Sequence, residues 1–195
     1  MRISSVTGCI LLLLICITSF LSAGHNLIKN PSFEEDHNGW ASHWYTRSYY
    51  EGENDVFYKL ETGNARTGER SIYTGSKREN DIRIYQIVEV EPLTVYRLSV
   101  WVKAEKINKG TGANISVPDS YAASDGVQGT TKEWQEVVLY GMTGKYQTRM
   151  PVTLRIGGWS GFSSGEAVFD DVSMVEVTER PRGKRIESLS FSFDV

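Results

Sequence analysis

The stretch that decides the fold class is TVYRLSVWVKA, residues 94–104, near the middle of the chain. One alternate set of its residues is apolar: Tyr96, Leu98, Val100 and Val102. The other set is mostly polar: Arg97, Ser99, Trp101 and Lys103. Successive side chains of a β-strand point to opposite faces of the sheet. The stretch therefore predicts a strand with one face in a hydrophobic core and the other at least partly in contact with water.

Six further stretches show a strand-like composition, and turn residues such as Gly, Asn, Asp and Pro separate them. They are DVFYKL (55–60), RSIYTG (70–75), DIRIYQIVEV (81–90), WQEVVLYG (134–141), PVTLRIGG (151–158) and AVFDDVSMVEV (167–177). Helical periodicity is hard to find anywhere in the chain. Many short strands between turns predict an all-β fold, either a two-sheet antiparallel β-sandwich or a barrel.

The first 24 residues have the features of a secretory signal peptide. Arg2 is their only charge, the apolar run ILLLLICITSFL follows at 10–21, and small residues occupy 22–24. The run is short for a membrane span and no stop-transfer pattern follows it. We therefore expect residues 1–24 to be removed and the mature protein to be secreted, without a membrane partner.

Composition limits what the mature chain can do. Both cysteines, Cys9 and Cys16, lie within residues 1–24, so the mature chain cannot form disulfides and extra stabilisation must come from sheet area or a metal ion. Without Arg2 it has 20 basic and 24 acidic residues, a net charge of about −4. With no large basic block, nucleic acid is not an expected partner.

The chain length after cleavage fits one domain, which we place at residues 25–178. Residues 179–195 differ in composition, because 180–185 are basic and broken by Pro and Gly, as in a linker. Apolar residues then alternate with polar ones up to Val195. This pattern is either an additional edge strand or the start of a further domain, and we favour the second.

Five phrases occur in an order that resembles the carbohydrate-binding modules of families four, nine and twenty-two, which are galactose-binding-like jelly rolls. They are NLIKNPSFEEDHNGW (26–40), ARTGERSIYT (65–74), YQIVEVEPLTVYRLSVWVKA (85–104), KEWQEVVLYG (132–141) and AVFDDVSMVEV (167–177). The resemblance implies a two-sheet jelly roll that binds polysaccharide of the xylan or β-glucan class on a concave face. It also implies a structural calcium ion away from the sugar, no catalytic chemistry, and attachment to a glycoside hydrolase.

The paired carboxylates Glu34 and Glu35 have three interpretations: acid catalysis, a metal site or a solvated surface turn. Calcium is bound by oxygen ligands, from carboxylates and backbone carbonyls. The resemblance implies that the ion lies where the first strand, the loop before RSIYTG and the last strand meet. The implied ligands are the Ser32 carbonyl, the Glu34 side chain, the Thr67 and Arg70 carbonyls, and the side chain and carbonyl of Asp170. Asp171 is the alternative to Asp170, because alternation sends one of the two outward.

Sugar binding requires flat apolar rings and planar hydrogen-bonding groups. Tyr85 is the first candidate, because it lies on the face opposite Ile84 with Arg83 beside it. Trp101 shares the polar face of its strand with Arg97 and Ser99, and it is either a platform for a sugar ring or covered by a loop. Three aromatic residues in predicted loops are further candidates for the groove wall: Trp44, Tyr121 and Trp159. The usual tryptophan before the corresponding strand is replaced by ENDIR at 79–83, so the glycan class stays open.

Enzyme signatures are weak. GFSSG at 161–165 fits a G-x-S-x-G pattern, but all three histidines precede it and a predicted strand follows it, so a nucleophile elbow is not expected. The leading interpretation is a non-catalytic carbohydrate-binding module. The alternatives are a secreted structural or adhesion module that binds a protein partner, and a small glycosidase.

Overall fold

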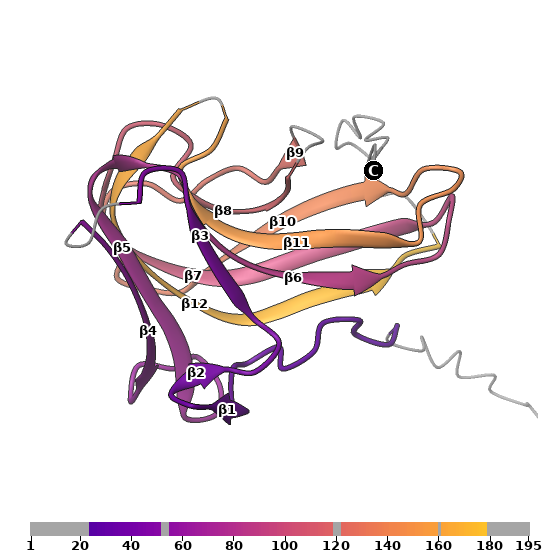
Figure 1. Ribbon diagram of the computed structural model, residues 1–195, viewed down its shortest axis with the longest axis horizontal. Helices are drawn as coiled ribbons and strands as arrows, with labels where there is room; N and C mark the ends of the chain where they lie inside the picture. The colour runs from indigo at the N-terminus through magenta and orange to yellow at the C-terminus, as the bar shows by residue number, and fades with distance from the viewer. Residues whose placement is uncertain (1–23, 52–54, 119–121, 160, 179–195) are drawn as a thin grey trace, which may run out of the picture.

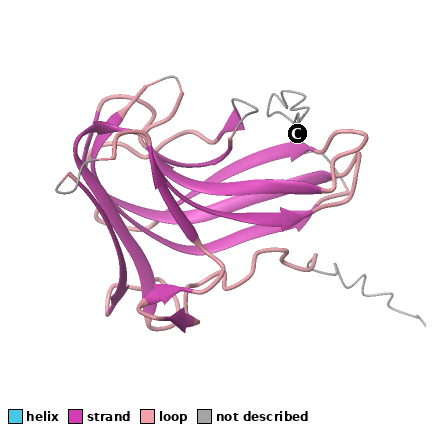
Figure 2. Ribbon diagram, in the orientation of Figure 1, coloured by secondary structure: helices cyan, strands magenta, loops and turns pink. Residues whose placement is uncertain are grey.

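A computed structural model describes residues 24–51, 55–118, 122–159 and 161–178. Strands are the regular structure of this part of the chain, and it contains no helix (Figure 2). No segment among the described residues is a helix long and apolar enough to cross a membrane. The strands are β1 (Asp36–His37), β2 (Trp40–Ala41), β3 (Tyr45–Ser48), β4 (Val56–Thr62), β5 (Arg70–Asn80), β6 (Ile82–Glu89), β7 (Val95–Asn108), β8 (Ala113–Val117), β9 (Ala122–Ala123), β10 (Gln135–Met142), β11 (Arg149–Ile156) and β12 (Ser163–Glu176).

Two antiparallel five-stranded sheets form the domain (Figure 1). One sheet has the strand order β10-β7-β12-β5-β4, and the other has the order β3-β6-β11-β8-β9. The short strands β1 and β2 form a separate hairpin beside them. The all-β, two-sheet antiparallel sandwich predicted from the sequence is therefore confirmed.

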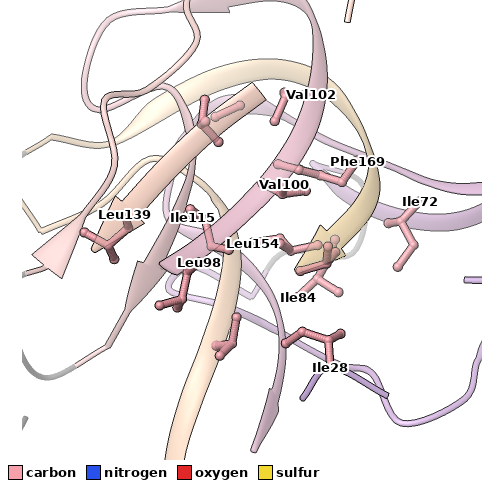
Figure 3. Close-up of a cluster of buried hydrophobic side chains, with 14 of the residues drawn as sticks. Ile28, Ile72, Ile84, Leu98, Val100, Val102, Ile115, Leu139, Leu154 and Phe169 are labelled. Carbon is pink, nitrogen blue, oxygen red and sulfur yellow. The ribbon is translucent and has the colours of Figure 1, made fainter. Parts of the chain in front are cut away.

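The hydrophobic core lies between the two sheets (Figure 3). The alternation in β7 is confirmed, because Leu98, Val100 and Val102 are fully buried. The central strands contribute large residues from both sides: Phe169 comes from β12, and Leu154 comes from β11 in the opposite sheet. Because apolar burial stabilises a domain by about 25 cal/mol per Å², this shared layer is the main source of stability.

The opening phrase closes the sandwich by binding to β12. The Asn26 side-chain amide donates to the Val172 carbonyl at 3.0 Å, and its carbonyl accepts from the Met174 amide at 2.9 Å. Phe33 is fully buried, and its ring centroid lies 5.3 Å from that of Trp44. The start of the domain is thus hydrogen-bonded to its last strand, and Phe33 anchors it in the hydrophobic core.

Two predicted segments lie outside the described residues. The signal peptide falls almost entirely in residues 1–23, and the linker with its possible further strand occupies 179–195. Both assignments stay predictions.

Candidate functional site

Eight residues on the outer face of the β3-β6-β11-β8-β9 sheet form two parallel rows, because directly paired residues of antiparallel strands share a face. One row contains Tyr45, Tyr85, Thr153 and Ser116. The other contains Arg47, Arg83, Arg155 and Asn114. We call these eight residues the arginine–tyrosine face.

Two tyrosine rings form the aromatic part of this face. Tyr85 points away from the core, as the alternation in β6 predicts, since Ile84 and Val88 are buried on the other side. Its ring centroid lies 5.8 Å from that of Tyr45, with 37° between the ring planes. Tyr45 is 60% exposed. An apolar ring surface is therefore presented to solvent beside the arginine row.

A buried ion-pair cluster lies under the arginine row. Asp81 accepts hydrogen bonds from Nε and Nη2 of Arg155, and it accepts from the same atoms of Arg83 at 3.2 and 2.6 Å. Asp81 and Arg155 are nearly inaccessible to solvent. Burial by itself would raise the pKa of Asp81, but the hydrogen bonds and charges of Arg155 and Arg83 outweigh it and hold that pKa below its ordinary value. The cluster therefore stays ionised and fixes both guanidinium planes.

Trp159 joins the arginine–tyrosine face from the loop after β11. Its ring centroid lies 5.4 Å from Cζ of Arg83 and 5.6 Å from Cζ of Arg155, which is cation–π distance. The side chain is still about half exposed. Of the sequence-predicted ligand residues, the structure thus brings Tyr85, Arg83 and Trp159 together.

Three buried polar atoms on this face lack a hydrogen-bond partner within the described part of the protein. They are Thr153 Oγ1, Ser116 Oγ and Asn114 Oδ1. Folded proteins pair more than nine in ten buried polar groups, because an unpaired one costs about 1–3 kcal/mol. Their residues are adjacent across β8 and β11, so hydrogen-bonding capacity is concentrated at one place on the sheet.

Two of the candidate aromatics lie elsewhere. Trp44 is buried in the core and its Nε1 donates to the Asn30 carbonyl at 3.0 Å, so the expectation that it lines a groove is wrong. Trp44 does lie in the loop between β2 and β3, but its ring turns inward and packs on Phe33. Trp101 is on the outer face of the other sheet, with the Arg66 guanidinium 3.8 Å above its ring centroid. Tyr121 lies outside the described residues.

Sequence reasoning missed most of the polar residues on the face, and the carboxylate beneath it: Arg47, Asn114, Ser116, Thr153 and Arg155, with Asp81. The signal was present in β11, where Thr153 and Arg155 alternate with Val152, Leu154 and Ile156. Because both neighbouring strands pair with β11, its outward positions identify the centre of the sheet surface.

A second candidate region is the junction of the first strand, the loop at 66–70 and β12, where the metal was predicted. Glu34 Oε1 accepts from the amides of Glu69 and Arg70, both at 2.9 Å. Asp170 Oδ2 accepts from the amides of Arg66 and Thr67 at 2.6 and 3.1 Å. Gly68 lies between these pairs with φ +66°, and a Cβ on it would collide with the Glu34 carboxylate. The loop therefore follows the two carboxylates closely.

Both adjacent aspartates of β12 contact this loop, so strict alternation does not apply to them. Asp171 has φ 50°, and the register of β12 against β7 shifts between Asp170 and Ser173. Such a bulge redirects a side chain that regular pleating would send to the other face. Asp171 accepts from Ser32 Oγ at 2.7 Å, from Arg66 Nη1 at 2.6 Å and from the Thr67 hydroxyl.

The two aspartates have opposite electrostatic environments. Burial, and to a smaller extent the negative charge of Asp171, raises the pKa of Asp170 to about 6 even though three amides donate to it. Burial acts on Asp171 as well, but hydrogen bonds from Thr67, Ser32 and Arg66 hold its pKa below its ordinary value. Asp170 is fully buried, and its hydrogen-bond donors are backbone amides. A cation beside Asp170 would therefore be favourable.

The contacts differ from the predicted ligand set. Thr67 and Arg70 direct amide N–H groups, rather than carbonyls, toward the carboxylates, and Ser32 contributes its hydroxyl. Within the described residues, no group of three or more His, Cys, Asp or Glu side chains is placed to hold a metal ion. A cation would still fit at this junction, because the buried charge of Asp170 is unbalanced and the Glu34 carboxylate is nearby. Its remaining ligands would have to be backbone oxygens.

Comparison with known proteins identifies the class. Residues 25–149 match the family described as a carbohydrate binding domain, and the chain belongs to this family, as the resemblance predicted. No curated protein matches the chain. The family assignment therefore rests on the match to residues 25–149, and solved structures add support for the fold alone.

Three solved structures illustrate the likeness. A family 61 carbohydrate-binding module in complex with β-1,4-galactotriose is 24% identical, with a TM-score of 0.54, and the match covers 78% of this chain and 99% of that one. A family 4 module is 15% identical, with a TM-score of 0.52, covering 77% and 99%. The xylanase 10B structure from Clostridium thermocellum, a family 22 module with a glycoside hydrolase family 10 module and xylohexaose, is 18% identical, with a TM-score of 0.50, covering 79% and 29%. At these identities the likeness establishes the fold.

Proposed function

We propose that this domain binds polysaccharide on the arginine–tyrosine face without catalysing a reaction. The observation that carries the proposal is the coincidence, on one sheet surface, of exposed aromatic rings with a row of planar hydrogen-bonding groups, in which Arg47 is exposed and Arg83 is partly exposed. Sugars combine apolar CH faces with many hydroxyl groups, so they match both features. Membership of the carbohydrate-binding domain family supports the proposal.

The aromatic and polar residues of the face have different roles in the proposed binding. The rings of Tyr85 and Tyr45 stack against pyranose CH groups, and Trp159 lies at the end of the same surface. Arg47 and Arg83 can donate to sugar hydroxyls from this surface, whereas the unpaired atoms of Thr153, Ser116 and Asn114 lie beneath it, closed to solvent. Because Asp81 holds the Arg83 guanidinium in place, binding requires little further ordering of this side chain.

Replacing Tyr85 with alanine tests the proposed function. We expect Tyr85→Ala to weaken binding of an oligosaccharide ligand by at least about tenfold, equivalent to about 1.4 kcal/mol, since the stacking surface is lost. The measurement is isothermal titration with xylohexaose, β-1,4-galactotriose and cello-oligosaccharides. Tyr146→Ala is the matched control, because Tyr146 is 83% exposed on the loop between β10 and β11.

A protein that is folded but gives flat titrations with every polysaccharide tried would contradict the proposal. That result would favour the alternative of a structural or adhesion module, in which the exposed rings contact a protein partner. Equal loss in Tyr85→Ala and Tyr146→Ala would likewise remove the face from the binding site.

We further propose that the junction of Glu34 and Asp170 holds a structural calcium ion. The support is the buried Asp170 carboxylate beside Asp171, together with the Glu34 carboxylate on the same loop. When bound, calcium would supply a cationic partner for the Asp170 carboxylate, to which only backbone amides donate among the described residues. Glu34 and Asp170 would hold it, and they would link the first strand to the last.

Calcium removal gives the test. At about 100 times its dissociation constant, calcium is expected to add about 2.7 kcal/mol of stability, which is roughly 5–10 °C in Tm for a domain of this size. Thermal melting in EDTA and in calcium measures the difference. Asp170→Asn is expected to lose the response, whereas Asp55→Asn, in a surface ion pair with Arg78, is expected to keep it. Identical melting curves with and without calcium would exclude the ion.

Export and attachment to a glycoside hydrolase complete the proposal. Export is supported by the composition of residues 1–24. Attachment is supported by the xylanase 10B structure, in which a module of this fold accompanies a catalytic one.

A further inference from the structure

The arginine–tyrosine face and its sheet surface are positively charged on an otherwise acidic protein. The outward positions of β3, β6 and β11 carry four arginines: Arg47, Arg83, Arg149 and Arg155. The acids on the same surface are Asp81 and Glu89, so its net charge is about +2, whereas the whole chain has −3. A positive charge concentrated on the proposed binding face of an acidic protein indicates that the face selects ligands by their charge.

The hydrogen bonds of the cluster show which arginine is available. Asp81 neutralises Arg155, which it binds through both carboxylate oxygens deep in the surface. Arg83 shares only Asp81 Oδ2, its side chain is 14% exposed, and its Nη1 makes no hydrogen bond within the described residues. Arg47 lies directly opposite Arg83 in the strand register and is exposed. One carboxylate thus serves two guanidinium groups, and Arg83 with Arg47 retains unbalanced positive charge.

We propose that the ligand is an anionic polysaccharide whose acidic groups bind Arg83 and Arg47. This inference rests on the proposed function and specifies its substrate class. A planar guanidinium matches a carboxylate or a sulfate ester through paired hydrogen bonds, and Arg is suited to this because it stays charged. Tyr85 and Tyr45 are adjacent to these arginines across the same strand pair, so one residue of the glycan can stack while its acidic group is bound.

A structural role alone accounts for Arg155 but not for Arg83 and Arg47. Burial of Asp81 requires a single cationic partner, and Arg155 already provides two hydrogen bonds to it. Arg83 is the second cation on the same carboxylate, and Arg47 donates none of the side-chain hydrogen bonds found in the described residues. The excess charge is therefore placed where a ligand would meet it.

The test compares polymers that differ in charge. Binding of the purified protein to polygalacturonate is measured by isothermal titration beside carboxyl-reduced polygalacturonate, sulfated galactan and neutral β-1,4-galactan. We expect at least one acidic polymer to bind about tenfold more tightly than its neutral counterpart. Arg47→Gln with Arg83→Gln is expected to remove this preference, because each charge-assisted hydrogen bond contributes about tenfold or more. Lys59→Gln with Lys132→Gln is the control of equal charge, since both are exposed and lie away from the face.

The outcomes separate the inference from the proposed function. Preference for polygalacturonate over its reduced form indicates a uronic acid ligand, and preference for sulfated galactan indicates a sulfate ester. Equal binding of neutral and acidic polymers overturns the anionic ligand and leaves polysaccharide binding intact. Equal weakening by the lysine control also overturns it, because the attraction would then be nonspecific. Loss of binding to every polymer tested overturns the proposed function itself, provided that melting shows a folded protein.

Discussion

Asp81→Ala is expected to lower the free energy of unfolding by about 3–5 kcal/mol, the largest effect of any single polar substitution considered for this protein. The alanine would leave Arg155, which is 3% exposed, as a buried charge without a partner. Arg83 would lose its carboxylate as well. Urea unfolding at pH 7 measures the difference, and Asp55→Ala is the control, because the Asp55–Arg78 pair is exposed and surface pairs contribute about 0–1 kcal/mol.

The pH dependence of the same substitution gives an independent check. The folded pKa of Asp81 is lower than its ordinary value, so the ion pair stabilises the protein above that ordinary value, near 4. The contribution is lost as pH falls through the lowered folded pKa. The difference between wild type and Asp81→Ala should therefore be constant near neutral pH and shrink below about pH 4. A difference as large at pH 2 as at pH 7, or a loss no larger than that of Asp55→Ala, would contradict the assigned role.

Phe169→Ala is the second substitution with a large expected effect, about 3–5 kcal/mol. Phe169 is fully buried on β12, the central strand of its sheet, and packs into the layer that both sheets share (Figure 3). Its removal would leave a cavity that fixed strands on either side cannot close. Chemical denaturation measures the loss, with an unchanged m-value as the sign that the fold persists.

Phe57→Ala is the matched control for this prediction. Phe57 lies on β4 of the same sheet but on its outer side, where it is half-buried and its ring centroid lies 4.9 Å from that of Tyr73. The same atoms are removed, but solvent can occupy the space. We expect a clearly smaller loss for Phe57→Ala, and equal losses would mean that the core is not the dominant source of stability.

The sequence predicted the fold because regular alternation carries most of the information. All seven predicted strands are present, from β4 to β12, with shifted ends. Five strands were missed: β1, β2 and β9 have two residues each, β3 has four exposed or half-exposed residues, and the five residues of β8 are all buried, so that none of them shows alternation. Such strands lack a periodic pattern, and only pairing with distant strands defines them.

The candidate site was predictable only where one strand sufficed. Tyr85 and Arg83 could be placed on the outer face, because β6 alternates clearly. Arg155 and Asp81 could not be paired, since their contact joins positions 74 residues apart through the register of β6 and β11. The expectation that only one of Asp170 and Asp171 faces the loop at 66–70 failed for a different reason. Asp171 has a left-handed backbone conformation within a bulge, and this breaks the alternation on which the expectation depended.

The bonds between Asn26 and β12 have a consequence for protein engineering. Since Asn26 contacts Val172 and Met174 directly, the two ends of the domain lie side by side. A host protein could therefore receive the domain within one of its surface loops, because a loop that closes over a short distance loses little conformational entropy. The same proximity permits a short peptide to join the old ends and new ends to be opened at an exposed turn, such as the one near Tyr146.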